Sequence, residues 1–264
     1  MASDRVKRVS SEMADFYNSS DAYLKMLAAH DDLYLPKYVQ YVQKFVKPGS
    51  KIIDIGCGRG NSTALFSKTY DVIGADLSRK FIAYAKKNYK GAKFRVCSAL
   101  DLPFPDSSFD AAVSYGVIEH ITDVPKYLDE AMRVTKPGGC VIVVAPNLTS
   151  PLRPILAFFS AKGYVGFTSS RLQTFGWLVR SIGWSFSKWL AAKPRFIYRK
   201  PLLNASGPDA DATYVSNPYD IKKYLISKGF EVVGLSPNTF SLNFLPVIPP
   251  HIGVVAIKKL SPFA

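Results

Sequence analysis

Three glycines in five residues, placed directly after a short apolar run, constrain the fold of this chain more than any other feature. The apolar run consists of Ile52, Ile53 and Ile55. It predicts a buried strand, because a turn at residues 47–50 precedes it and the glycine turn ends it. The glycines are Gly56, Gly58 and Gly60. We expect a helix to follow them, capped from within the group Asn61, Ser62 and Thr63. Strand, glycine turn and helix start together let backbone N–H groups face a ligand without side chains in the way.

Two acids near the glycines indicate what that ligand is. A second predicted strand ends at Asp76, about 20 residues after the first glycine, where an acid can accept hydrogen bonds from both ribose hydroxyls. Asp54 lies two residues before Gly56, and its charge repels a pyrophosphate but attracts a cationic amino-acid group. Asn61 also stands where the dinucleotide pattern has its third glycine. A nicotinamide oxidoreductase is therefore the disfavoured alternative.

In these residues the chain resembles the class I S-adenosylmethionine-dependent methyltransferases, whose first motif is an acid followed by G-x-G-x-G. Residues 99–110, 118–120 and 136–139 look like later motifs of that family, in the same order. The resemblance covers residues 45–147 and, weakly, 218–258, and it includes the small-molecule enzymes of ubiquinone and menaquinone biosynthesis. It implies S-adenosyl-L-methionine as the cofactor and a Rossmann-like, seven-stranded sheet with an antiparallel last strand.

The alternation of strands and helices independently predicts a doubly wound α/β fold with a mostly parallel sheet. The predicted strands are residues 52–55, 71–75, 93–96, 109–114, 139–145, 230–235 and 252–258. The predicted helices include residues 10–46, 79–89, 124–135, 171–192 and 218–228. We expect an N-terminal helical lid (1–46), a cofactor-binding core (47–147), a helical insert after the fifth strand (148–217) and a completion of the sheet (218–264).

The resemblance also assigns cofactor contacts along this core. It implies that the methionine end lies over the glycine loop and near Tyr115, and that Asp76 holds the ribose. Ser98 stands where the family usually has an aspartate for the adenine amino group, which leaves the backbone of Ala99 and Leu100 to meet the adenine edge. The predicted cofactor-binding residues are Asp54, Gly56, Cys57, Gly58, Gly60, Asp76, Leu77, Ser98, Ala99, Leu100 and Tyr115.

The candidate catalytic residue is His120, which can act as a general base or orient an acceptor hydroxyl. The alternative is that His120 only caps or packs the following helix. Glu119, Tyr17 and Tyr23 are candidate substrate contacts, although both tyrosines can equally pack a helix onto the sheet. Related quinone enzymes have a Glu-x-x-Glu-His pattern connected with a metal, but Gly116 replaces the first glutamate here, so we predict no metal.

The positive charge of this chain is concentrated in the insert. The net charge is +14, and no acid occurs between Glu130 and Asp209, an interval that holds eleven lysines and arginines. The same interval contains a helical apolar stripe: Leu172, Phe175, Val179, Ile182, Phe186 and Trp189. Three interpretations fit this pattern: a substrate lid whose stripe packs on the sheet, an interfacial helix on an anionic membrane, or a nucleic-acid surface. The density of apolar residues disfavours nucleic acid.

Composition completes the prediction. The three cysteines, Cys57, Cys97 and Cys140, lie far apart without metal-binding spacing, which indicates reduced thiols in a cytoplasmic protein. We expect no signal peptide and no spanning helix, and a cytoplasmic location with possible peripheral membrane contact. The predicted function is methyl transfer to a small, largely apolar or lipid-like acceptor, and the alternative is an RNA-binding or RNA-modifying methyltransferase.

Overall fold

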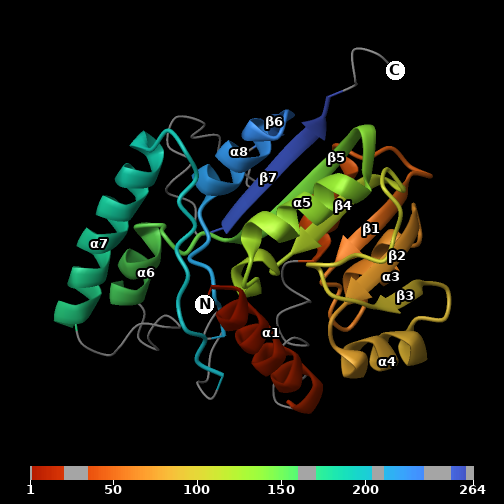
Figure 1. The fold of residues 1–264 in the computed structure, drawn as a ribbon, viewed down its shortest axis with the longest axis horizontal. Coiled ribbons are helices and arrows are strands. Elements are labelled where there is room, and N and C mark those ends of the chain that lie inside the picture. Colours follow the sequence, from red (N-terminus) through yellow and green to blue (C-terminus); the bar gives the residue numbers. More distant parts are fainter. Residues whose placement is uncertain (1, 21–34, 160–170, 204–210, 235–250, 260–264) are drawn as a thin grey trace.

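A single seven-stranded sheet forms the centre of the computed structural model, which describes residues 2–20, 35–159, 171–203, 211–234 and 251–259 (Figure 1). The strands are β1 (Lys51–Ile55), β2 (Asp71–Asp76), β3 (Lys93–Val96), β4 (Phe109–Tyr115), β5 (Thr135–Pro146), β6 (Phe230–Gly234) and β7 (His251–Lys258). Their order across the sheet is β3-β2-β1-β4-β5-β7-β6. The α/β sheet that the sequence predicts is therefore confirmed.

The direction of the strands fixes where a ligand can bind. Strands β1 to β5 run parallel, whereas β7 lies antiparallel between β5 and β6, as the family resemblance implies. The strand order reverses at β1, which pairs with β2 on one side and with β4 on the other. In open sheets of this type, ligands bind beyond the carboxyl ends of the strands at such a reversal.

Helices cover both faces of the sheet. They are α1 (Ala2–Ser19), α3 (Asn61–Phe66), α4 (Arg79–Asn88), the short 3₁₀ helix η1 (Ile118–His120), α5 (Val124–Val134), α6 (Leu152–Phe159), α7 (Arg171–Leu190) and α8 (Pro218–Ser227). A further helical segment spans residues 35–43. The single helix predicted over residues 10–46 is thus wrong in its bounds. Helix α1 begins earlier, at Ala2, and ends at Ser19, and the second helical segment ends at residue 43. Residues 21–34 lie outside the described part.

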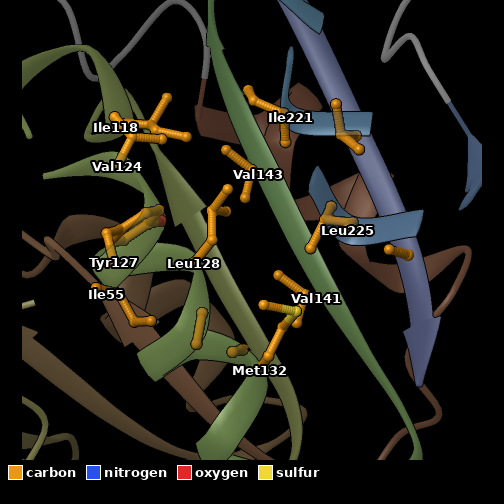
Figure 2. Close-up of a cluster of buried hydrophobic side chains, with 14 of the residues drawn as sticks. Ile55, Ile118, Val124, Tyr127, Leu128, Met132, Val141, Val143, Ile221 and Leu225 are labelled. Carbon is orange, nitrogen blue, oxygen red and sulfur yellow. The ribbon is translucent and has the colours of Figure 1, made fainter. Parts of the chain in front are cut away.

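The alternation of side chains along β5 divides the core into two clusters. Val141 and Val143 face α5 and α8, and Figure 2 shows Leu128 of α5 and Leu225 of α8 beside them. Ile142 and Val144 point to the opposite face and belong to the cluster under residues 35–43. Because successive side chains of a strand point to opposite faces, a strand buried on both faces reads as a continuous apolar run.

The structure of the insert contradicts one part of the three interpretations given to it, the packing of its apolar stripe on the sheet. Helix α7 forms where the stripe predicts it, but the stripe side chains are between 52% and 80% exposed. The interpretation in which this stripe packs on the sheet is therefore wrong. Lys188, one of the basic residues of the insert, is only 1% exposed.

Candidate cofactor and acceptor site

The glycine loop after β1 has the conformation and the space that only glycine allows. Gly56 and Gly60 have φ values of 71° and 87°, in the left-handed region that favours glycine. A Cβ atom on Gly60 would lie 2.7 Å from Ala85 Cβ of α4, and one on Gly56 would lie 2.3 Å from Val117 Cγ2. Side chains of neighbouring segments therefore pack tightly against the loop, and the glycines place no side chain over its backbone N–H groups.

The start of α3 is built differently from the predicted cap. The N-cap residue is Gly60, which has no capping side chain. The hydroxyls of Ser62 and Thr63 instead donate hydrogen bonds of 2.6 Å each to Asp54 Oδ2. Asp54 is 1% exposed, so this carboxylate holds α3 against the end of β1 and keeps a negative charge under the loop.

Asp76, the last residue of β2, connects the glycine loop to the next helix. Its Oδ2 accepts a hydrogen bond from Gly58 N–H at 2.9 Å, and its Oδ1 accepts one from Ser78 N–H at 2.8 Å. Burial raises the pKa of Asp76, and these backbone donors oppose that shift. A carboxylate has about four acceptor positions, so the ribose hydroxyls of a nucleoside can still be accommodated. Leu77 follows directly and lies partly buried at the same corner.

On the expected adenine side, Ser98 closes a tight turn. Its Oγ accepts a hydrogen bond from Leu100 N–H at 3.1 Å, and Ser98 forms a backbone bridge with Asp101. The serine that replaces the family's aspartate therefore uses one of the two backbone donors expected for adenine. Ala99 and Leu100 pack with partly buried side chains against the core.

Helix α1 lies across this edge of the sheet (Figure 1). Near its end, the carbonyl of Tyr17 accepts a hydrogen bond from Ser78 Oγ at 3.1 Å, at the start of α4. Near its middle, Ser10 Oγ and Thr122 Oγ1 are 2.7 Å apart. The helix thus bridges the start of α4 and the segment after η1. Tyr23 lies outside the described residues.

A cluster of polar side chains gathers beneath α1 around His120. Tyr17 Oη donates a hydrogen bond to Asp211 Oδ2 at 2.8 Å, and His120 Nδ1 lies 3.3 Å from the same oxygen. On the other side of the ring, His120 Nε2 is 3.8 Å from Glu119 Oε1. The cluster therefore brings together Tyr17, Glu119 and His120, which the sequence named separately.

Asp211 is the member of this cluster that the sequence analysis missed. It reaches His120 because residues 213 and 214 donate backbone hydrogen bonds of 2.7 Å and 2.9 Å to the carbonyl of Glu119. The available signal was that two acids, Asp209 and Asp211, follow a long interval without acids. Nothing in the sequence connects Asp211 with His120, which lies 91 positions earlier.

The other two predicted contacts, Cys57 and Tyr115, are packed into the structure around the loop, as is the unassigned Cys97. Cys57 is buried, and burial raises the pKa of its thiol, so it stays a packed thiol under the loop. Cys97 is partly buried, with its pKa raised to about 11 mainly by burial. Tyr115 ends β4, and its ring centroid lies 5.2 Å from that of Tyr38. No group of histidines, cysteines and acids suited to a metal occurs in the described ranges.

These features fit a nucleoside that carries an amino-acid group. The glycines leave the loop backbone open, Asp76 lies at the tip of β2, and the polar cluster around His120 lies on the other side, after β4. S-adenosylmethionine, when bound, supplies an electrophilic methyl group. The residues of the loop and Asp76 would hold it.

The fold, and the family match over residues 53–143, identify this part of the chain as a class I S-adenosylmethionine-dependent methyltransferase domain, whose cofactor is S-adenosylmethionine. Residues 53–143 match the family described as methyltransferase domain. A solved structure of an S-adenosylmethionine-dependent methyltransferase from Thermotoga maritima, titled a possible histamine N-methyltransferase, superposes with a TM-score of 0.56 at 19% identity. The superposition covers 92% of this chain and 98% of the Thermotoga maritima chain. At this sequence identity, it shows a likeness of fold.

Curated relatives share the domain and differ in activity. The chain is 31% identical over 144 residues to phosphoethanolamine N-methyltransferase of Triticum aestivum. The aligned segment covers 52% of this chain and 28% of that protein. The chain is 33% identical over 130 residues to the ubiquinone/menaquinone biosynthesis C-methyltransferase of Desulfotalea psychrophila, 46% of this chain and 53% of that protein. The chain therefore spans only about a quarter to a half of the length of these relatives.

Proposed function

We propose that this chain transfers a methyl group from S-adenosylmethionine to a small, largely apolar or lipid-like acceptor at an anionic membrane surface. The observation that carries the proposal is the orientation of α7. The four fully buried side chains of this helix, which face the protein, are all polar (Thr174, Ser181, Ser185 and Lys188), and the apolar Leu178 and Trp184 are half-buried. Those that face outward are apolar, the reverse of a helix that covers a water-soluble core.

Polar contacts hold α7 in this orientation. Ser185 Oγ donates a hydrogen bond of 2.8 Å to the carbonyl of Thr149, just after β5. The ammonium of Lys188 pairs with Asp220 of α8, and it donates a second hydrogen bond of 2.6 Å to the carbonyl of Arg195. Because the inward face is committed to these partners, the apolar stripe is left on the outside.

An interfacial position suits both the apolar stripe and the charge around it. Moving one side chain such as Phe175 or Phe186 from water into an apolar medium is worth about 1.5–3 kcal/mol. Each lysine or arginine near an anionic leaflet adds about 1 kcal/mol. The interval from residue 131 to 208 contains eleven lysines and arginines and no acid; Lys188, Arg133 and Lys136 pair with acids, which leaves eight for such a surface. Within the described residues, no helix is long and apolar enough to span a bilayer, so a helix lying flat in the interface is the matching form.

At the acceptor end, we propose that His120 orients the acceptor and takes its proton. Asp211 holds the imidazole in place, and Tyr17 holds Asp211 from the lid. Methyl transfer from a sulfonium needs mainly orientation and the exclusion of water, which the lid helix would supply. The insert that contains α7 also contains Asp211, the residue that contacts His120.

Vesicle binding tests the membrane part of this proposal. The wild-type chain is expected to co-sediment with phosphatidylcholine vesicles that contain phosphatidylglycerol, and less with phosphatidylcholine alone. The double variant Phe175→Ser/Phe186→Ser is expected to lose at least tenfold in partitioning, estimated as about 1.4 kcal/mol or more from two side chains. Ile226→Ser, which changes an exposed apolar side chain on α8, is the matched control.

Methyl transfer itself is followed with methyl-labelled S-adenosylmethionine and total lipid extract, with products identified by mass spectrometry. A labelled lipid product supports the proposed acceptor class. Label that enters only added RNA, together with salt-sensitive RNA binding lost in the same double variant, would favour the RNA-modifying alternative instead.

A further inference from the structure

The hydroxyl of Tyr38 has no hydrogen-bond partner among the residues that the structure describes, although the side chain is only 2% exposed. Tyr38 belongs to the helical segment 35–43, which packs on the sheet with Val42 and Val113 in one apolar cluster. A buried donor left without a hydrogen bond costs about 1–3 kcal/mol. Such groups are uncommon in native proteins, and a missing ligand is one physical explanation.

Tyr38 lies where β1 and β4 separate. The paired register of these strands ends at Asp54 and Val113. The ring centroid of Tyr38 is 5.2 Å from that of Tyr115, the last residue of β4. Burial raises the pKa of Tyr38 well above its usual value, and the nearby Asp54 carboxylate raises it further. The phenol therefore stays protonated and is available as a donor at the reversal point of the sheet, where ligands bind in such folds.

The neighbouring polar groups at this point already have partners. Asp54 accepts hydrogen bonds from the Ser62 and Thr63 hydroxyls, and Asp76 accepts them from backbone N–H groups at the ribose position. A nucleoside held at Asp76 by its ribose would leave its amino-acid end for the neighbouring strand ends, those of β1 and β4, where Tyr38 lies. That end carries a carboxylate, which is the acceptor that a buried hydroxyl donor lacks.

We propose that the Tyr38 hydroxyl donates a hydrogen bond to the carboxylate of the amino-acid end of S-adenosylmethionine. Tyr38 is then a cofactor-binding residue contributed by the helical segment before β1. This assignment concerns the cofactor alone, and it holds or fails independently of the proposed acceptor and of the membrane surface.

Titration calorimetry on the full chain tests this with two ligands. S-adenosylhomocysteine contains the amino-acid end, whereas 5′-methylthioadenosine keeps the adenosine and the sulfur but lacks that end. Tyr38→Phe is expected to weaken the affinity for S-adenosylhomocysteine about tenfold, the effect of losing one hydrogen bond to a charged group. Its affinity for 5′-methylthioadenosine is expected to equal that of the wild type.

Tyr41→Phe is the matched control, since Tyr41 lies on the same helical segment, is 5% exposed and also has a hydroxyl without a partner among the described residues. That hydroxyl lies beside Gly234 of β6, at the other edge of the sheet. Tyr41→Phe should leave both affinities unchanged, and neither variant should lower the melting temperature of the ligand-free protein. Unchanged S-adenosylhomocysteine affinity in Tyr38→Phe, or an equal loss for both ligands, would overturn the assignment.

Discussion

Replacing Lys188 by Met is expected to destabilise the protein by about 3–5 kcal/mol, because it leaves the Asp220 carboxylate buried without a counter-ion. Both side chains are 1% exposed. Asp220 would keep only neutral donors, among them Arg195 N–H at 2.9 Å and Tyr214 Oη at 3.4 Å. These donors do not replace a buried positive charge. At about 2–4 °C per kcal/mol for a chain of this size, Tm should fall by roughly 6–20 °C.

A double-mutant cycle separates this charge effect from lost packing. Asp220→Asn keeps an acceptor for Arg195 N–H but removes the charge, so the variant Lys188→Met/Asp220→Asn contains no unpaired ion. It should be more stable than the sum of the single variants by about 2 kcal/mol, within the range seen for contacting residues. Urea unfolding followed by circular dichroism gives each value, provided that the m-value is unchanged. A loss below about 1 kcal/mol in Lys188→Met, or additivity within about 0.5 kcal/mol, would refute the reasoning.

Three further predictions concern the core and the loop. Asp76→Asn should weaken S-adenosylhomocysteine binding about tenfold or more by calorimetry, because an amide is a poorer acceptor for the ribose hydroxyls and for Gly58 N–H. Gly60→Ala should destabilise the protein more than Gly229→Ala in urea unfolding: both glycines have a positive φ, but only Gly60 has atoms in the way. The Arg133 side chain lowers the pKa of Glu130, so this acid contributes stability above its ordinary pKa of 4.5 that is lost as pH falls through the lowered value. Glu130→Gln should therefore show a smaller loss of urea midpoint than the wild type between about pH 6 and pH 3.

The parts of the site that depend on local sequence were predictable. The glycine loop and Asp76 belong to two consecutive strand ends, and parallel neighbours bring such ends together without further information. The cap of α3 was not predictable in the same way. Ser62 has the chemistry of a cap, but Gly60 occupies the N-cap position and Ser62 lies inside α3, where its hydroxyl donates to Asp54, a buried carboxylate that becomes available only when the strand and helix pack.

Distant contacts explain the other differences. Asp211 approaches His120 because the backbone of residues 213 and 214 pairs with the carbonyl of Glu119, and that pairing joins segments more than 90 positions apart. No spacing rule relates such positions. The antiparallel placement of β7 came from the family resemblance for the same reason, since a single strand pattern contains no direction.

The orientation of α7 shows most clearly what periodicity leaves open. A helical stripe shows that two faces exist, and the usual assumption turns the apolar face inward because burial of apolar surface drives folding. Here the inward face is decided by Asp220 and the carbonyl of Thr149, which provide partners for Lys188 and Ser185. A buried ion pair and hydrogen bonds contribute little net stability compared with apolar packing, which is why we propose a membrane surface as the second medium for the apolar face. If the Lys188→Met variant unfolded at a lower urea concentration but bound vesicles as well as the wild type, the ion pair would serve the fold alone. Weaker vesicle binding would mean that the pair also holds the stripe in position for the membrane.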